Sequence, residues 1–385
     1  MDGSFRIGRL FGIPILIHFT FILIIPLFAF IIASQVIPTI DLLLSFYNSF
    51  LPENLQFTID TTLITTGYMP YILGTVIAFG LFAGVLIHEL AHSLVAQHSG
   101  IKINSITLLI FGGIASMEEG IPDPKTEFPM ALVGPVASLL VGLACSGLVY
   151  LMPALFSDPA VAGVFIFLFG YLGLLNIILF VFNLLPAFPM DGGRVLRAWL
   201  AQRMPLPRAT KIAADIGKGF AVIFAIIGIF GYNPMLLLIA FFIYIGAGQD
   251  TVAVKYSVLL RDIRVGAIMS RPVVTVAPTM PVTKVIEMMY ATKHLGFPVI
   301  DNNVLVGMVT VADVQKRSPI DRDAMQVRDV MNRNVIAVQP ETPVTDVLRI
   351  MSARDIGRVL VVENGVLVGI VTRSDILKVV ELKEI

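Results

Sequence analysis

The chain has 385 residues, 56% of them hydrophobic and only 14% charged, and its formal net charge is zero. Soluble domains carry roughly a quarter charged residues, so this composition excludes an ordinary soluble protein and predicts that most of the chain lies in a lipid bilayer. The balanced charge also argues against a nucleic-acid partner. The single cysteine, Cys145, excludes an intrachain disulfide.

Six apolar runs before Gln249 are predicted to be transmembrane helices, although the last two are short. The first run is too long for the apolar core of a signal peptide and no convincing cleavage site follows it, so we expect it to be retained. After Lys255 the composition becomes that of a soluble α/β domain. The six runs cover residues 13–33, 71–96, 130–151, 161–185, 213–230 and 234–247.

The distribution of basic residues orients these runs. Arg6 and Arg9 precede the first run, and further basic residues cluster after the fourth and sixth runs, whereas the stretch from Leu10 to Ile101 contains no Lys or Arg. Because cytosolic loops are enriched in Lys and Arg, both termini are expected in the cytosol. The protein is therefore predicted to be a multi-pass plasma-membrane protein, and the charge bias without disulfides fits a prokaryotic cell.

The second run contains the sequence His-Glu-Leu-Ala-His at residues 88–92. On a helix this spacing places His88 and His92 one turn apart on one face, where both can ligate one Zn²⁺, and it places Glu89 beside them to move protons. Glu89 is also the only acid in the run, which has no Lys or Arg. A water-using metal site at membrane depth predicts hydrolysis of peptide bonds within the membrane.

Between the second and third runs, residues 101–119 are predicted to form strand, turn and strand. Ile103, Ile106 and Thr107 are β-branched, and Gly112 and Gly113 mark a turn. An edge strand beside the metal would clamp an unwound peptide substrate. The alternative is a cytosolic hairpin without a role in substrate binding.

A catalytic zinc site needs a third protein ligand. Asp191 follows the fourth run, where Pro186 and Pro189 break the helix and two glycines allow the carboxylate to reach sideways. The predicted orientation places Asp191 at the cytosolic depth of His88 and His92. The remaining histidines include His18, which is expected to have a packing or interfacial role.

These motifs resemble the site-2 protease family of intramembrane zinc metalloproteases. The resemblance covers residues 5–249, and it rests on the HExxH run, on the pattern N-x-x-P-x-x-P-x-D-G from Asn183 to Gly192, on residues 12–18 and on the Gly112-Gly113 and Gly134-Pro135 pairs.

The resemblance implies that His88, His92 and Asp191 hold one Zn²⁺ per chain and that Glu89 is the general base. It also implies a substrate that spans the membrane. Asn183 would hydrogen-bond the substrate backbone, and the alternative is an amide that packs between helices.

The soluble part is an internal repeat. Residues 265–278 match residues 327–340, and residues 307–314 match residues 369–376 at the same offset. Each copy is predicted to contain a strand, a helix, two strands and a second helix. The fold class is therefore a membrane protein of about six helices, with a short membrane-associated β-hairpin, followed by a cytosolic α/β repeat.

The repeat resembles a tandem pair of cystathionine-β-synthase (CBS) modules, which usually pair face to face and can bind ATP or AMP in the clefts between them. The alternative is that each Thr and Asp caps the helix that follows it, and that the pair gates the enzyme or forms a homodimer without a ligand. The positions that match the nucleotide-binding pattern are Thr310, Asp313, Thr372, Arg373 and Asp375.

The predicted domains are a protease domain at 1–250, a linker at 251–264 and CBS copies at 265–320 and 321–385. We expect an intramembrane zinc endopeptidase that cuts transmembrane proteins near the cytosolic face and is modulated by an adenine nucleotide. A channel or transporter with CBS modules is the competing class, and an inactive scaffold is a third. The intact Glu89 argues against the scaffold.

Overall fold

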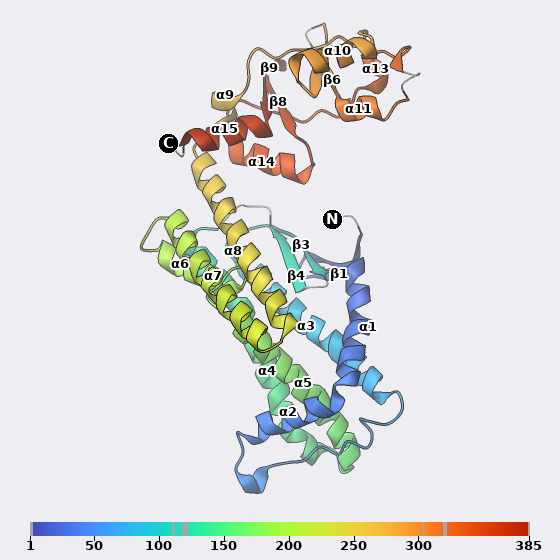
Figure 1. Ribbon diagram of the computed structural model, residues 1–385, viewed down its shortest axis with the longest axis vertical. Helices are drawn as coiled ribbons and strands as arrows, with labels where there is room; N and C mark the ends of the chain where they lie inside the picture. The colour runs from blue at the N-terminus through green and yellow to red at the C-terminus, as the bar shows by residue number, and fades with distance from the viewer. Residues whose placement is uncertain (1–2, 110–111, 118–121, 303, 319–321, 384–385) are drawn as a thin grey trace. The chain divides into compact units, whose positions relative to one another are not determined.

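The computed structural model describes residues 3–109, 112–117, 122–302, 304–318 and 322–383. The chain forms two compact units, Met1–Val254 and Lys255–Ile385. The first consists of long helices with one small sheet, and the second is a mixture of short helices and strands (Figure 1).

Two of the long helices of the first unit begin at an aspartate that caps them. Asp123 and Asp158 each precede a proline, and their side chains accept hydrogen bonds from the backbone N–H groups of Lys125 and Ala160. The last helix continues into the second unit. The helices are α1 (Phe19–Ser34), α2 (Val36–Asn48), the 3₁₀ helix η1 (Glu53–Leu55), α3 (Met69–His98), α4 (Pro124–Leu155), α5 (Pro159–Asn183), α6 (Asp191–Ala201), α7 (Leu206–Phe230) and α8 (Pro234–Leu260).

The number of membrane-spanning helices differs from the prediction of about six. Among the described residues, α3, α4, α5 and α7 are long and apolar enough to cross a membrane, and a fifth span results only if α1 and α2, which are bent by 74°, count as one. The apolar part of α8 covers only Pro234–Gly248. Hydropathy overestimated the first run because its beginning, Ile13–His18, is a strand and only the rest is helical.

A four-stranded sheet replaces the isolated hairpin that the sequence predicted. The predicted strand–turn–strand segment does form two antiparallel strands, but the first of them also pairs in parallel with a strand near the N-terminus. Residues 110–111 and 118–119 of the predicted segment lie outside the described residues. In sheet order the strands are β1 (Ser4–Leu10), β2 (Ile13–His18), β3 (Ile103–Leu109) and β4 (Gly112–Met117).

The sheet is attached to α3 by a small apolar core. Ile13 and Ile15 from β2 and Ile106 from β3 are buried with Leu90, which lies within the HExxH sequence of α3. Because β4 is hydrogen-bonded to β3, this core also holds β4 beside the same turn of α3. The sheet is therefore positioned by the residues that flank the predicted metal ligands.

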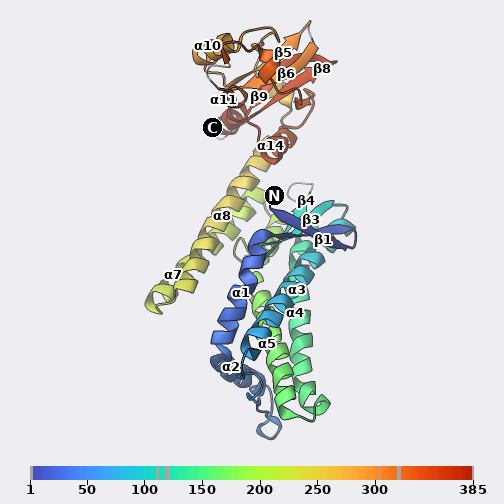
Figure 2. The ribbon, with the colours of Figure 1, turned by 90° about the vertical axis from the view of Figure 1, so that its right-hand side faces the viewer.

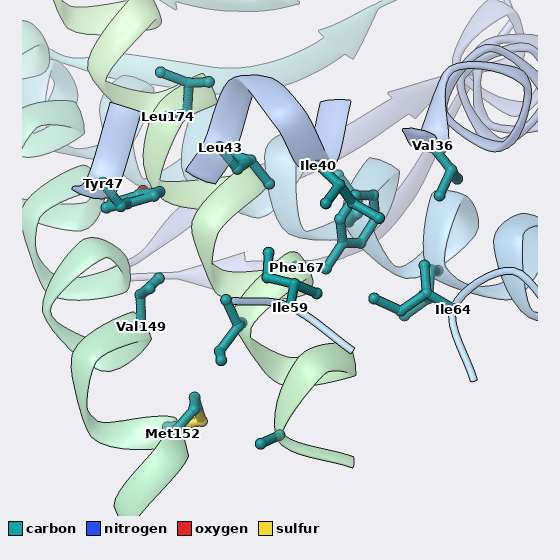
Figure 3. Packing of buried hydrophobic residues seen from close by; sticks show 14 of the residues in the cluster. Val36, Ile40, Leu43, Tyr47, Ile59, Ile64, Val149, Met152, Phe167 and Leu174 are labelled. Carbon is teal, nitrogen blue, oxygen red and sulfur yellow. The ribbon is translucent and has the colours of Figure 1, made fainter. Parts of the chain in front are cut away.

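Residues 34–70 form the largest core of the first unit together with α3, α4 and α5. Figure 3 shows Ile40, Leu43 and Tyr47 of α2 directed toward Phe167 of α5. The Tyr47 hydroxyl donates a hydrogen bond of 2.9 Å to the carbonyl of Gly170. These contacts therefore fix α2 against α3 and α5, the helices that contain predicted site residues.

The second unit contains two copies of one motif, as the repeat predicted. In each copy a helix is followed by an antiparallel strand pair and a second helix, and Figure 2 shows the two strand pairs. The initial strand of the second copy is β7, whereas that of the first copy is reduced to a single bridge between Val276 and Val299. The elements are α9 (Val265–Ile268), α10 (Val282–Thr292), β5 (Gly296–Asp301), β6 (Val304–Thr310), α11 (Val311–Gln315), α13 (Val327–Val330), β7 (Ala337–Val338), α14 (Val344–Ala353), β8 (Arg358–Glu363), β9 (Val366–Thr372) and α15 (Arg373–Lys383).

Candidate metal centre

His88 and His92 lie on one face of α3 and point toward each other. Both side chains are buried, and their Nε2 atoms are 3.0 Å apart. The i, i+4 spacing produces this arrangement because residues four apart are neighbours on a helix surface. Gly134 of α4 makes room for the ring of His92, since a Cβ at this position would overlap it.

Asp191 completes a cluster of three buried side chains. Its Oδ2 atom lies 3.1 Å from Nε2 of His88 and 3.1 Å from Nε2 of His92. The carboxylate reaches this position because α6 begins there after a tight turn. A Cβ on Gly192 would overlap the carbonyl oxygens of the preceding turn, and a Cβ on Gly193 would meet the backbone of Phe188. The two glycines are therefore required for the packing of this turn.

The three donor atoms fit a tetrahedral Zn²⁺ site. Zinc bonds to nitrogen and oxygen of about 2.0–2.1 Å place neighbouring ligand atoms about 3.3 Å apart, close to the 3.0–3.1 Å between these three atoms. Nδ1 of His92 lies 2.5 Å from the carbonyl of Met130. A carbonyl only accepts hydrogen bonds, so Nδ1 carries a proton, which leaves Nε2 as the ring atom that can ligate a metal.

A second contact orients the other ring. Nδ1 of His88 lies 2.9 Å from the hydroxyl of Ser138, which is fully buried in α4. Helix α4 thus supplies the outer partner of both histidines, which is the usual way in which proteins fix the tautomer and direction of metal-binding imidazoles. The sequence did not single out Ser138, because an isolated serine in an apolar run carries no distinctive pattern.

Two arginines and a glutamate form a cluster of ion pairs that reaches Asp191 through Arg194. Glu127 of α4 is fully buried and forms an ion pair with the buried Arg197 of α6. Arg194 lies between the two acids, with Nε 3.8 Å from Glu127 Oε1 and Nη1 3.7 Å from Asp191 Oδ1. Sequence reasoning treated these arginines only as orienting charge. The available signal was the repeated spacing of three residues, from Asp191 to Arg194 and from Arg194 to Arg197, which places all three on one side of α6.

A cavity of about 800 Å³ opens beside the cluster. Glu89 lines it and packs against Gly113 of β4, whose missing side chain leaves the necessary space. Asn183 lines the same cavity from the end of α5, and its amide nitrogen donates a hydrogen bond of 3.0 Å to Leu179 of its own helix. The structure therefore brings the five predicted protease-site residues to one cavity, although Asn183 is partly engaged by its own helix.

The five predicted nucleotide-site residues do not line one common cleft. Thr310 and Asp313 form a reciprocal cap at the start of α11, and Thr372 and Asp375 make the same contacts at the start of α15. The predicted alternative, helix capping, thus describes the hydrogen bonds of both pairs. Thr372, Arg373 and Asp375 also line a cleft of about 430 Å³, whose lining does not include Thr310 or Asp313.

Comparison with known proteins defines the class to which this chain belongs. The model of peptidase family M50 matches residues 76–158 and 146–224, and the CBS domain model matches residues 265–319 and 327–382. The chain is 35% identical over 387 residues to a zinc metalloprotease of Methanocaldococcus jannaschii, an alignment that covers 100% of this chain and 99% of the relative.

A second relative is the Mycobacterium tuberculosis protein Rip3, whose name assigns it to the zinc metalloproteases. It is 27% identical over 398 residues, with coverage of 99% of this chain and 94% of Rip3. The solved site-2 protease of Methanocaldococcus jannaschii is 33% identical, covers 64% of this chain and 95% of its own, and superposes with a TM-score of 0.41.

The chain is a member of peptidase family M50, the site-2 proteases, and carries a tandem CBS pair. The predicted family and the predicted enzyme class, a zinc metalloprotease, are confirmed. Membership also favours the enzyme over the competing channel or transporter.

Proposed function

We propose that this protein is an intramembrane endopeptidase that hydrolyses peptide bonds of membrane-spanning proteins near the cytosolic face. His88, His92 and Asp191 would hold one Zn²⁺, and Glu89 would be the general base. The observation that carries the proposal is the convergence of three buried ligand atoms, 3.0–3.1 Å apart, on one cavity that Glu89 also lines. Two of the helices that line this cavity, α3 and α5, are apolar enough to span a membrane.

The metal ion and the side chains of the protein would have separate roles in the reaction. When bound, Zn²⁺ supplies a Lewis acid that polarises a carbonyl and makes water a stronger nucleophile. Glu89 takes the proton from the attacking water and delivers it to the leaving amine, a role that requires a carboxylate beside the ligands. Apolar side chains such as Phe28, Phe82 and Ile114 form part of the cavity lining, and a less polar surrounding strengthens electrostatic contacts.

The edge strand β4 is the proposed place for the substrate. In the described sheet β4 has a neighbour on one side only, and its Gly112 and Gly113 line the cavity. A transmembrane helix must unwind before its peptide bonds become accessible, and an edge strand can pair with the extended segment that results. Asn183, which lines the same cavity, would hydrogen-bond the substrate backbone through its amide oxygen. The alternative is that β4 binds no substrate and is only a structural strand of the sheet.

The topology and the domain division are part of the proposal. The basic residues Arg6 and Arg9 favour a cytosolic N-terminus, and the same rule places the CBS pair in the cytosol of a multi-pass plasma-membrane protein. The protease domain would comprise residues 1–250, with a linker at 251–264 and CBS copies at 265–320 and 321–385.

We further propose that an adenine nucleotide modulates the protease through the CBS pair. The cleft beside Thr372 and Asp375 supports this, because its carboxylate suits two ribose hydroxyls and Arg373 suits a phosphate. Action of the pair without a ligand, as a gate or as the contact of a homodimer, is the alternative.

The test is zinc content together with cleavage of a generic transmembrane substrate in detergent, for the wild type and for Glu89→Gln, with and without ATP. We expect one zinc per chain in both proteins and loss of cleavage by roughly 10²–10⁴-fold in Glu89→Gln, the usual contribution of a general base. Glu53→Gln, the same change at an exposed position, is the control. Freshly purified wild type without zinc, or full cleavage by Glu89→Gln, would overturn the proposal.

A further inference from the structure

The two carboxylate oxygens of Asp191 face different groups. Oδ2 lies 3.1 Å from Nε2 of His88 and 3.1 Å from Nε2 of His92, where a metal ion would be bound. Oδ1 faces Arg194, whose Nη1 atom is 3.7 Å away. At this distance the contact is an ion pair rather than a hydrogen bond. One oxygen of the carboxylate is thus paired with the two histidines and the other with a cation.

The number of oxygens that Asp191 offers to the metal decides whether water can bind there. A catalytic Zn²⁺ has three protein ligands and keeps its fourth position for water or substrate. A carboxylate can bind a metal through one oxygen or through both, and a second oxygen from Asp191 would compete for the position that water needs. An ion pair at Oδ1 opposes this, because a carboxylate oxygen that faces a guanidinium gains a contact between opposite charges.

Arg194 is itself held by a buried carboxylate. Its Nε atom lies 3.8 Å from Oε1 of Glu127. Glu127 is fully buried, and Arg197 binds both of its oxygens, through Nε at 3.3 Å and through Nη2. A carboxylate that is gripped by two nitrogens of a planar guanidinium has little freedom to turn. Glu127 therefore gives Arg194 a second contact that does not move.

The same cluster contacts the turn that presents Asp191. The guanidinium carbon of Arg197 lies 5.0 Å from the ring centroid of Phe188, which is within the range of a cation–π contact. Phe188 is fully buried and precedes Asp191 by three residues. The metal ligand and the turn before it are therefore both connected to Glu127 of α4, the first by Arg194 and the second by Arg197.

The buried part of the cluster is complete without Arg194. Glu127 and Arg197 already neutralise each other through two contacts, which is the arrangement that a buried ion pair requires. The side chain of Arg194 is a quarter exposed and lines the cavity together with Glu89. Packing of α6 on α4 does not need a cation at the cavity wall, so the contact with Asp191 is what explains its position.

We propose that Arg194 is a positioning residue that keeps Asp191 a one-oxygen ligand. It would hold Oδ1 away from the metal and so keep one coordination position free for the attacking water. This role depends on the proposed zinc site and specifies how one of its ligands binds. Arg194 has no contact with the substrate in this role, and Glu127 holds it in place.

The test compares Arg194→Met and Arg194→Lys with the wild type, in the full chain in detergent. Methionine removes the charge from an unbranched side chain, and lysine restores one cation that can face Oδ1. Arg194→Gln replaces Arg194→Met if the latter does not fold. Arg208→Met, at an exposed position of α7, is the control. The first readout is the visible spectrum after Co²⁺ is bound in place of zinc, because four-coordinate Co²⁺ absorbs much more strongly than Co²⁺ with five or six ligands.

We expect strong four-coordinate bands in the wild type, in Arg208→Met and in Arg194→Lys. Arg194→Met should lose several-fold in intensity, because Oδ1 becomes free to bind the metal. Zinc affinity of Arg194→Met should fall by no more than about 10–100-fold, the usual effect of losing an outer partner. Cleavage of a transmembrane substrate should show kcat lowered by roughly 10–100-fold at unchanged KM, since an outer partner of the metal and no substrate contact is lost.

The possible failures are distinguishable. Wild type that takes up neither cobalt nor zinc overturns the proposed zinc site and the role of Arg194 with it. Wild type with strong bands that Arg194→Met leaves unchanged overturns the positioning role alone, and a raised KM would then mean that Arg194 contacts the substrate. An equal loss of intensity in Arg208→Met also overturns the role, because the effect would not depend on the contact with Asp191.

Discussion

The metal centre and the CBS cleft hold their polar and charged side chains in opposite environments, buried in the first and exposed to water in the second. At the metal centre His88, His92 and Asp191 are each less than one-tenth exposed, and each has a partner from α4 or α6. In the cleft beside Thr372, the basic residues Lys293, His294 and Lys378 are exposed. Water solvates these charges until a ligand replaces it, whereas the buried groups must be paired at all times.

This difference in burial predicts which substitutions will destabilise the protein. A buried polar group that loses its partner suffers the full cost of desolvation, about 1–3 kcal/mol and more for a charge. An exposed charge that is removed alters binding but leaves folding nearly unchanged. The metal centre should therefore lose stability or metal on small changes, and the cleft should lose only its ligand.

Asp191→Asn is expected to have the largest effect. Complete zinc sites bind with about 10–16 kcal/mol, so one ligand of three or four contributes roughly 3 kcal/mol or more, a loss of a hundredfold to a thousandfold in zinc affinity. Zinc per chain after dialysis against a chelator, and cleavage of a transmembrane substrate, measure it. Asp41→Asn, at an exposed position of α2, is the control. Retention of full zinc by Asp191→Asn would remove this residue from the ligand set.

Glu127→Gln tests the cost of a buried charge without its partner. Arg197 would stay buried without an anion, and such changes destabilise proteins by about 3–5 kcal/mol. The thermal unfolding midpoint in detergent is expected to fall accordingly. Replacing both residues, Glu127→Leu with Arg197→Met, should recover much of the loss because no buried charge is left. If the double variant unfolds at a temperature as low as that of Glu127→Gln, the ion pair contributes more to stability than the mutual neutralisation of two buried charges.

Ser138→Ala should weaken zinc binding without unfolding the protein. Loss of the outer partner of His88 releases the ring, and such changes typically cost 10–100-fold in metal affinity. Ser93→Ala is the matched control, since Ser93 is equally buried and its hydroxyl has no hydrogen-bond partner among the described residues. Titration of the apo protein with zinc against a competing chelator distinguishes the two. Equal affinities for both variants would mean that the contact of 2.9 Å between Ser138 and His88 does not orient the ring.

Thr310→Ala and Thr372→Ala should have the smallest and most similar effects on stability. Each removes one helix cap, worth about 1 kcal/mol. Only Thr372→Ala is expected also to weaken ATP binding, because Thr372 lines the cleft and Thr310 does not. Thermal unfolding with and without ATP reports both quantities in one experiment. Loss of ATP stabilisation in Thr310→Ala would place a ligand in the other cleft as well.

Several features could be read from local patterns alone. The HExxH spacing required only a helix to bring His88 and His92 together, and the matching offsets of the repeat required only that similar segments fold alike. The break at Pro186 and Pro189 likewise marked the turn that precedes Asp191. Hydropathy was a poorer guide to secondary structure. It does not distinguish an apolar strand, such as residues 13–18, from the beginning of an apolar helix.

What the sequence by itself determined is the chemistry: which side chains are able to bind metal, where the chain is apolar, and that its last third is duplicated. The tertiary structure decided the parallel pairing of β2 with β3, the choice of Ser138 and Met130 as partners of the two imidazoles, and the ion pair between Glu127 and Arg197. It also decided that basic side chains gather in the cleft beside Thr372. Patterns of spacing and hydropathy are local, whereas these contacts join residues far apart in the chain, and they exist only because burial leaves each polar group the few partners that packing brings within reach.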